Sequence, residues 1–143
     1  MPQKRALALA LGDVASLVAF GVLGLASHER EFTAAAFARA VLPFAAAWLA
    51  LGWPLGAFGL HDGRPALTGW RFAAAWLVCG TAALGARALV FDRHLLNAFF
   101  VIALAGNGLS LAAWRLAFDR LWSRRTASRG GAGAATAEGV KSW

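Results

Sequence analysis

Asp13 is the residue best placed to do chemistry, because it interrupts an apolar run from about residue 6 to 26. A charged side chain at the centre of a membrane helix costs about 2.5–3.5 kcal/mol on insertion scales, and such residues often mark ion, proton or ligand paths. If the helix enters the bilayer at Ala6, Asp13 lies roughly 10 Å inside the boundary. A short carboxylate side chain at that depth needs a partner within the protein.

The last apolar run, from about residue 95 to 118, offers partners for Asp13. Measured from the end of that run, Ser110 lies about 12 Å and Asn107 about 16 Å inside the same boundary. Arg115 begins near about 4 Å, and its long side chain reaches deeper or shallower. We therefore predict a polar intramembrane cluster between the first and last helices, made of Asp13, Ser16, Asn107, Ser110 and Arg115.

Three interpretations of this cluster are open. Asp13 and Arg115 pair and fix how two helices dock; or the cluster binds an ion, a proton or a small polar ligand; or Asp13 contacts a helix of another protein. An Asp13→Asn variant separates the first two, because a docking role predicts lost stability and a ligand role predicts a folded but inactive protein.

A second polar group is predicted near the opposite boundary. Arg87 follows Arg71 by sixteen residues and so lies roughly 24 Å from the first boundary, too far from Asp13 for a direct bond. We expect Arg87 to extend outward or to meet His28 and Asp92 in an outer-side polar group.

The sequence holds no recognisable catalytic set. No Ser-His-Asp arrangement, phosphate loop or dinucleotide fingerprint is present. Cys79 is the single cysteine, and the three histidines lie at predicted helix ends on two sides of the membrane, so no shared metal site is expected. We expect a protein that is not an enzyme, with no catalytic residues, no metal and no cofactor.

The composition explains which elements must position these groups. Apolar residues make up 59% of the chain and charged residues 15%, too few to cover a soluble domain of 143 residues. Four apolar runs approach the roughly 20 residues that span a hydrocarbon core. We predict an all-α integral membrane bundle over residues 1–122 and a disordered cytoplasmic tail over 123–143, with transmembrane helices at about 6–26, 37–58, 72–91 and 95–118.

The basic residues predict the orientation. With the N-terminus inside, the inner loops and ends carry ten Lys and Arg residues and the outer loops carry four, Arg30, Arg39, Arg87 and Arg93. The positive-inside rule then puts both termini in the cytoplasm, and Trp53, Trp70 and Trp122 fall near the inner interface. The net charge of +7 gathers at the ends and forms no basic helix face, so we expect no nucleic-acid partner.

One internal similarity joins the second and third runs. Residues 44–52 and 72–80 agree at seven of nine positions, each beginning with Phe-Ala-Ala-Ala-Trp and ending in Gly. The two helices run in opposite directions, so the match indicates either an inverted repeat of the kind found in transporters or a coincidence between Ala- and Leu-rich helices.

These residues resemble a family of small bacterial and archaeal membrane proteins, domain of unknown function family 3054. The resemblance covers about residues 8 to 118 and excludes the tail. It implies a four-helix membrane protein without an established activity, and it marks Asp13 and Arg115. The positions that carry it are Gly12, Asp13, Phe20, Gly24, His28, Pro43, Phe44, Trp48, Gly80, Arg87, Phe99 to Val101, Trp114 and Arg115.

Two functions are compatible with these observations. The first is a structural or accessory subunit of a membrane assembly in the inner (plasma) membrane of a prokaryote, surrounded by lipid and present as a homo-oligomer or in a larger complex. The alternative is a small oligomeric transporter or channel component for an ion or a small polar solute, using the cluster around Asp13.

Overall fold

The computed structural model describes residues 2–27, 33–59, 66–91 and 98–139, and the elements in these ranges are four α-helices. They are α1 (Pro2–Ala26), α2 (Ala34–Gly52), α3 (Gly69–Phe91) and α4 (Ala98–Gly139). Each holds a stretch that is long and apolar enough to cross a membrane. The predicted all-α class with four transmembrane helices is confirmed.

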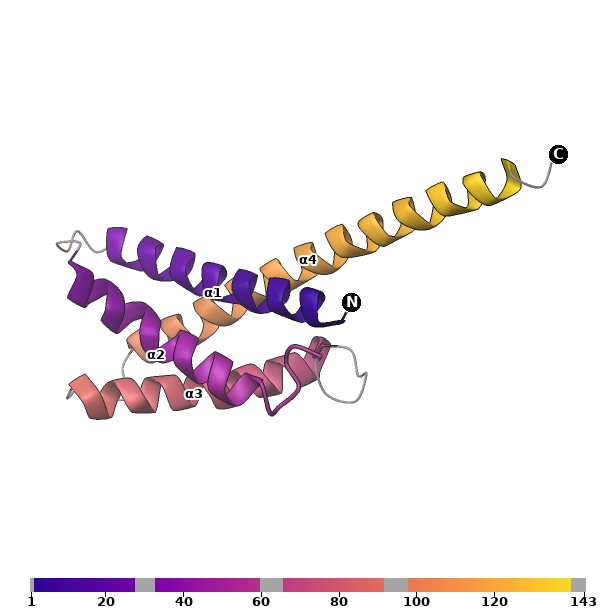
Figure 1. The fold of residues 1–143 in the computed structure, drawn as a ribbon. Helices are drawn as coiled ribbons and strands as arrows, with labels where there is room; N and C mark the ends of the chain where they lie inside the picture. The colour runs from indigo at the N-terminus through magenta and orange to yellow at the C-terminus, as the bar shows by residue number, and fades with distance from the viewer. Residues whose placement is uncertain (1, 28–32, 60–65, 92–97, 140–143) are drawn as a thin grey trace.

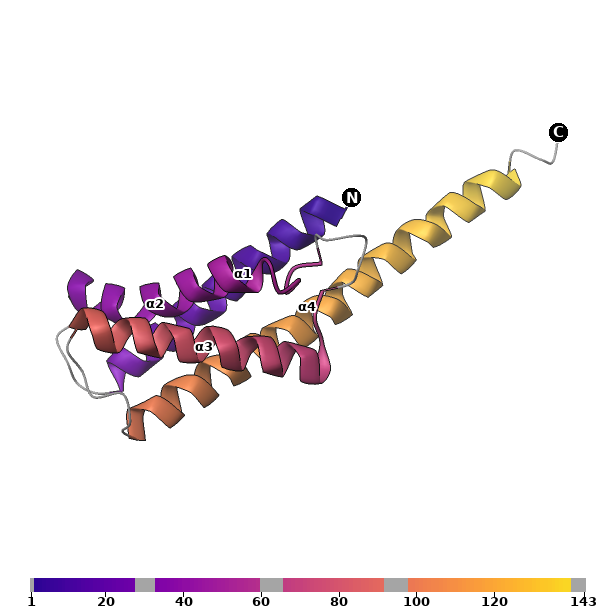
Figure 2. The ribbon, with the colours of Figure 1, turned by 90° about the horizontal axis from the view of Figure 1, so that it is seen from below.

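The helices form a ring in which each one contacts two neighbours. α1 packs against α2 and α4, and α3 packs against the same two helices, while the backbones of the diagonal pairs stay apart within the described residues. Figures 1 and 2 show the alternating directions that short connections impose. The start of α1, the end of α2 and the start of α3 therefore lie together, at what we call the termini end of the bundle (Figure 1).

The second helix is shorter than the predicted range of 37–58. It begins after Thr33, whose hydroxyl accepts from the Ala36 N–H at 3.1 Å, and it ends at Gly52. Pro54, which has no N–H to donate to a helical ladder, lies two residues beyond this end, whereas Pro43 lies within α2. The chain then turns through Gly56, at a φ of 78°, and returns to the core.

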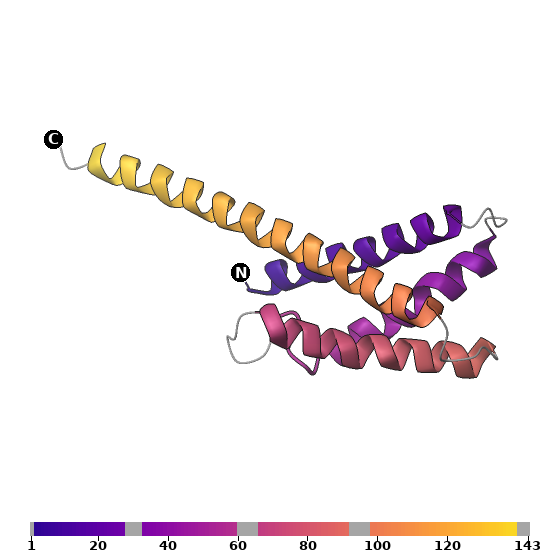
Figure 3. The same ribbon diagram turned by 180° about the vertical axis from the view of Figure 1, so that it is seen from behind.

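The fourth helix is longer than predicted. Its backbone is helical to Gly139, and it extends past the other helices at the termini end (Figure 3), where the sequence had indicated a disordered tail from residue 123. Propagating a formed helix costs little nucleation free energy, and the Ala and Arg residues of this segment favour helix. Residues 95–97 of the predicted range lie outside the described residues.

The core at the α2–α3 crossing is aromatic and comes from the two similar segments of the sequence. Phe44 stacks on Trp76 with ring centroids 6.3 Å apart, and Trp48 meets Phe72 edge-on at 5.8 Å. The two tryptophans also meet each other at 5.7 Å. Because the helices are antiparallel, the matched Phe and Trp positions face each other reciprocally. This packing fixes the direction in which each indole N–H points.

At the α1–α4 crossing, an aromatic ring of each helix packs against a glycine of the other. A Cβ on Gly12 would lie 1.9 Å from the Trp114 ring, and a Cβ on Gly106 would lie 2.2 Å from the Phe20 ring. Each helix thus supplies one glycine and one large ring, which lets the two backbones approach closely. This close approach brings the polar residues of α1 and α4 together.

Candidate functional site

Asp13 and Arg115 form an ion pair in the interior of the bundle. The Arg115 Nη2 lies 2.6 Å from the Asp13 Oδ2, and the Arg115 Nε lies 3.2 Å from both carboxylate oxygens. The pairing joins the middle of α1 to α4. Asp13 is 0% exposed and Arg115 is 6% exposed, so protein surrounds both charges.

The α2 helix and the chain that follows it complete the coordination of this pair. The Trp48 indole Nε1 donates to the Asp13 Oδ2 at 2.8 Å. The Arg115 Nη1 donates to the carbonyl oxygens of Ala57, at 2.9 Å, and Leu67, at 3.3 Å. Both carbonyls belong to the α2–α3 connection outside the helices, where backbone acceptors are free of ladder bonds. One guanidinium therefore ties together α1, α4 and both ends of this connection.

Three aromatic rings enclose the Arg115 guanidinium. Its central carbon lies 5.2 Å from the Trp48 ring, 5.2 Å from the Phe72 ring and 5.7 Å from the Phe58 ring. Aromatic faces carry negative potential, so they stabilise a cation that has lost its water. We call the ion pair, Trp48, Phe58, Phe72 and the two carbonyls the central latch.

The other predicted cluster residues lie deeper and do not bond to the ion pair. The Ser16 and Ser110 hydroxyl oxygens are 2.7 Å apart, and the Ser110 hydroxyl also lies 3.4 Å from the Ser16 carbonyl oxygen. The Asn107 amide donates to the Ala103 carbonyl of its own helix at 2.9 Å. Asn107 precedes Arg115 by eight residues, about 12 Å along a helix, beyond hydrogen-bond reach. The predicted cluster thus divides into three separate contacts.

The outer-side polar group falls largely outside the described residues. His28 and Asp92 both lie there. Arg87 lies on α3, near its end, and is half-buried.

Two polar contacts near the site were not predicted from the sequence. Trp48 was assigned no polar role, although an indole N–H in an apolar helix needs an acceptor. Arg5 and Asp119 form a second α1–α4 ion pair at 2.6 Å, nearer the termini end, with side chains 30% and 40% exposed. The sequence signal for that pair was Asp119, which stands among the basic residues near the end of the last apolar run. An exposed pair of this kind contributes about 0–1 kcal/mol.

The Trp48 hydrogen bond predicts a measurable difference between two tryptophans. Trp48→Phe should lower the free energy of unfolding by about 1.5–3 kcal/mol, because its partner is a charged carboxylate. Trp76 is the matched control, since its indole donates at 2.9 Å to the neutral Leu104 carbonyl. Trp76→Phe should cost about 0.5–1.5 kcal/mol for that bond. Equal losses, measured by denaturant unfolding in detergent micelles, would contradict a charged role for the Trp48 contact.

Most of the hydrogen-bonding groups of the ion pair have partners inside the protein. The carboxylate oxygens accept from the Trp48 Nε1 and from the Arg115 Nε and Nη2, and the Arg115 Nη1 donates to two backbone carbonyls. The Asp13 carboxylate is 0% exposed, and its hydrogen-bond donors Trp48 and Arg115 lie within the bundle.

Comparison with known proteins gives one match, which is to a family model. No curated protein and no solved structure matches the chain. A family model matches residues 10–118, a range that contains every residue of the central latch. With four apolar helices and this match over most of its length, the chain belongs to the family described as protein of unknown function (DUF3054).

Proposed function

We propose that the protein is a non-enzymatic membrane protein that serves as a structural or accessory subunit of a membrane assembly. The observation that supports this proposal is the central latch. Both of its charges are buried, and the donors to Asp13, Trp48 and Arg115, lie within the bundle. Such a pair is costly to bury and gives little net stability compared with apolar packing, but it specifies one arrangement of the helices. A rigid, uniquely packed bundle suits a subunit that presents fixed surfaces to its neighbours.

The outer faces of the helices support association in the membrane. Large apolar side chains project outward from each of the four helices, including Leu11, Leu42, Leu89 and Leu109, which are all at least 60% exposed. Gly24 and Gly85 also lie where an added Cβ would meet nothing within 4 Å. Small residues on a lateral face allow another helix to approach closely. Lipid or partner subunits would cover these faces.

Purification of the full chain in a mild detergent tests the proposed role. Light scattering coupled to size-exclusion chromatography would give the protein mass, and mass spectrometry would identify companions. The proposal expects a particle several times heavier than the 15.0 kDa chain, or a companion in fixed ratio. A strict monomer with no companion would contradict it.

We propose that both termini lie on the cytoplasmic side of a prokaryotic inner membrane. Lys4, Arg5, Arg120 and Arg124 near the termini end support this side by the positive-inside rule. Gln3 and Ser27, both exposed at opposite ends of α1, provide the test in a Cys79→Ala background. An impermeant maleimide should label Ser27→Cys in intact cells and Gln3→Cys only after permeabilisation. The reverse pattern would overturn the orientation.

Transport is the second candidate, and one observation favours it. The ion pair, the Ser16–Ser110 contact and Asn107 follow each other along the α1–α4 interface, as polar groups of a conduction path would. Proteoliposomes that contain a pH-sensitive dye would reveal proton flux. Flux that is present in the native protein and lost in Asp13→Asn would favour transport over the subunit role.

A further inference from the structure

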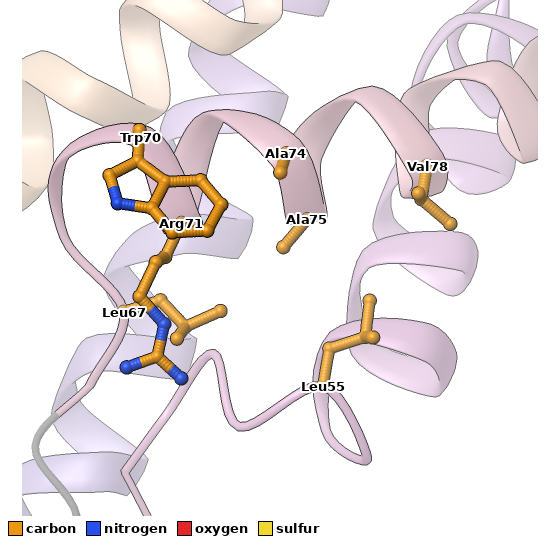
Figure 4. A pocket seen from close by; sticks show the side chains of 7 residues that line it. All are labelled: Leu55, Leu67, Trp70, Arg71, Ala74, Ala75 and Val78. Carbon is orange, nitrogen blue, oxygen red and sulfur yellow. The ribbon is translucent and has the colours of Figure 1, made fainter.

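An apolar groove with one basic residue lies between the α2–α3 connection and the first turns of α3 (Figure 4). Its cavity volume is about 230 Å³, with Leu67 and Ala75 at its base and Leu55, Ala74 and Val78 beside them. Leu55 and Val78 are 44% and 57% exposed, so the groove opens on the outer surface of the bundle. Its aliphatic lining suits a hydrocarbon chain.

The groove holds one charged side chain, Arg71. Figure 4 shows its guanidinium beside Leu67, away from Leu55 and Val78. Arg71 is exposed, and the described part of the chain gives it neither an ion pair nor a hydrogen bond. A guanidinium presents a planar fork of donors that matches phosphate oxygens. The available charge is therefore complementary to an anion whose other part is apolar.

The groove lies at the depth of lipid headgroups. Trp70 lines it and is 79% exposed, and Trp53, at the end of α2, is 51% exposed. Exposed tryptophans of membrane proteins gather at the boundary between hydrocarbon and headgroups. Arg71 lies in the first turn of α3, and Val78 lies about two turns further along the helix, or roughly 10 Å deeper. The basic end thus faces headgroups and the aliphatic end faces acyl chains.

We propose that this groove is a binding site for an anionic phospholipid, with the phosphate on Arg71 and one acyl chain along Leu67, Ala75 and Val78. A lipid with net negative charge is preferred, because the cationic group of a zwitterionic lipid competes with Arg71 for the phosphate. The bound lipid touches Leu67, whose carbonyl accepts from Arg115 in the central latch.

The experiment uses the purified, delipidated full chain and two lipids with identical acyl chains, phosphatidylglycerol and phosphatidylcholine. Native mass spectrometry after titration gives the apparent Kd of each. Phosphatidylglycerol should bind about fivefold more tightly, the factor expected for one basic residue near the headgroup. Equal affinities would overturn the proposal, and so would inorganic phosphate that competes as effectively as the lipid does.

Three variants separate the two parts of the site. Arg71→Gln should abolish the preference for phosphatidylglycerol, and Ala74→Phe, which fills the groove, should weaken both lipids. Arg124 is the matched control, an exposed arginine at the same end that does not line the groove. Arg124→Gln should keep the native preference. A preference that survives in Arg71→Gln, or one lost equally in Arg124→Gln, would show a diffuse surface effect and overturn the site.

Discussion

Replacing Arg115 by Met should lower the free energy of unfolding by about 3–5 kcal/mol, the cost of leaving one partner of a buried ion pair alone. The variant leaves the Asp13 carboxylate 0% exposed with only the Trp48 N–H as a named donor. It also removes the donor of the Ala57 and Leu67 carbonyls, so the α2–α3 connection loses its tie to α4. Unfolding in mixed micelles, followed by circular dichroism, measures the loss.

Arg124→Met is the matched control for this variant. Arg124 lies on the same helix and is exposed, so its replacement should change the stability by less than about 0.5 kcal/mol. A loss of similar size in both variants would mean that helix charge, and not the central latch, sets the stability.

A methyl group at Gly12 should separate the two helices that hold the ion pair. An Ala Cβ there would lie 1.9 Å from the Trp114 ring, so the indole or the helix axis must move. Overpacking of this kind costs about 1–3 kcal/mol, beyond the gain of up to about 1 kcal/mol that Ala gives over Gly in a helix. Gly12→Ala should therefore destabilise the bundle in the same unfolding assay.

Two comparisons make this prediction specific. Gly24 is also in α1, and a Cβ there meets nothing within 4 Å, so Gly24→Ala should be neutral or stabilising. In a Trp114→Leu background the ring is gone, and Gly12→Ala should then lose most of its cost. An equal cost of Gly12→Ala in both backgrounds would show that the Trp114 contact is not responsible.

The ion pair was predictable because depth along a membrane helix follows from residue counting. Asp13 lay too deep for a short side chain to reach water, and Arg115 was the one long basic side chain in the last helix close to its level. In the structure the Arg115 Nη2 lies 2.6 Å from the Asp13 Oδ2, so the two side chains meet as predicted. Asn107 does not bond to the ion pair, because the eight residues that separate it from Arg115 exceed the reach of its amide.

Trp48 and the backbone carbonyls were not predictable in the same way. Counting residues gives depth but not the rotation of α2 about its axis, which its aromatic crossing with α3 sets. The Ala57 carbonyl reaches Arg115 because the chain leaves the helix after Gly52 and turns at Gly56, and residue counting along a continuous helix to residue 58 gives no such turn. The turn that follows Gly52 therefore sets part of the site.

The double-mutant cycle of Asp13→Asn and Arg115→Met tests the central claim most directly. If the two residues hold the helices by pairing, the double variant should lose less stability than the two single losses combined, with a coupling free energy of about 1–3 kcal/mol. Single losses that add up within error would show that Asp13 and Arg115 act independently, and would contradict a latch that joins α1 to α4.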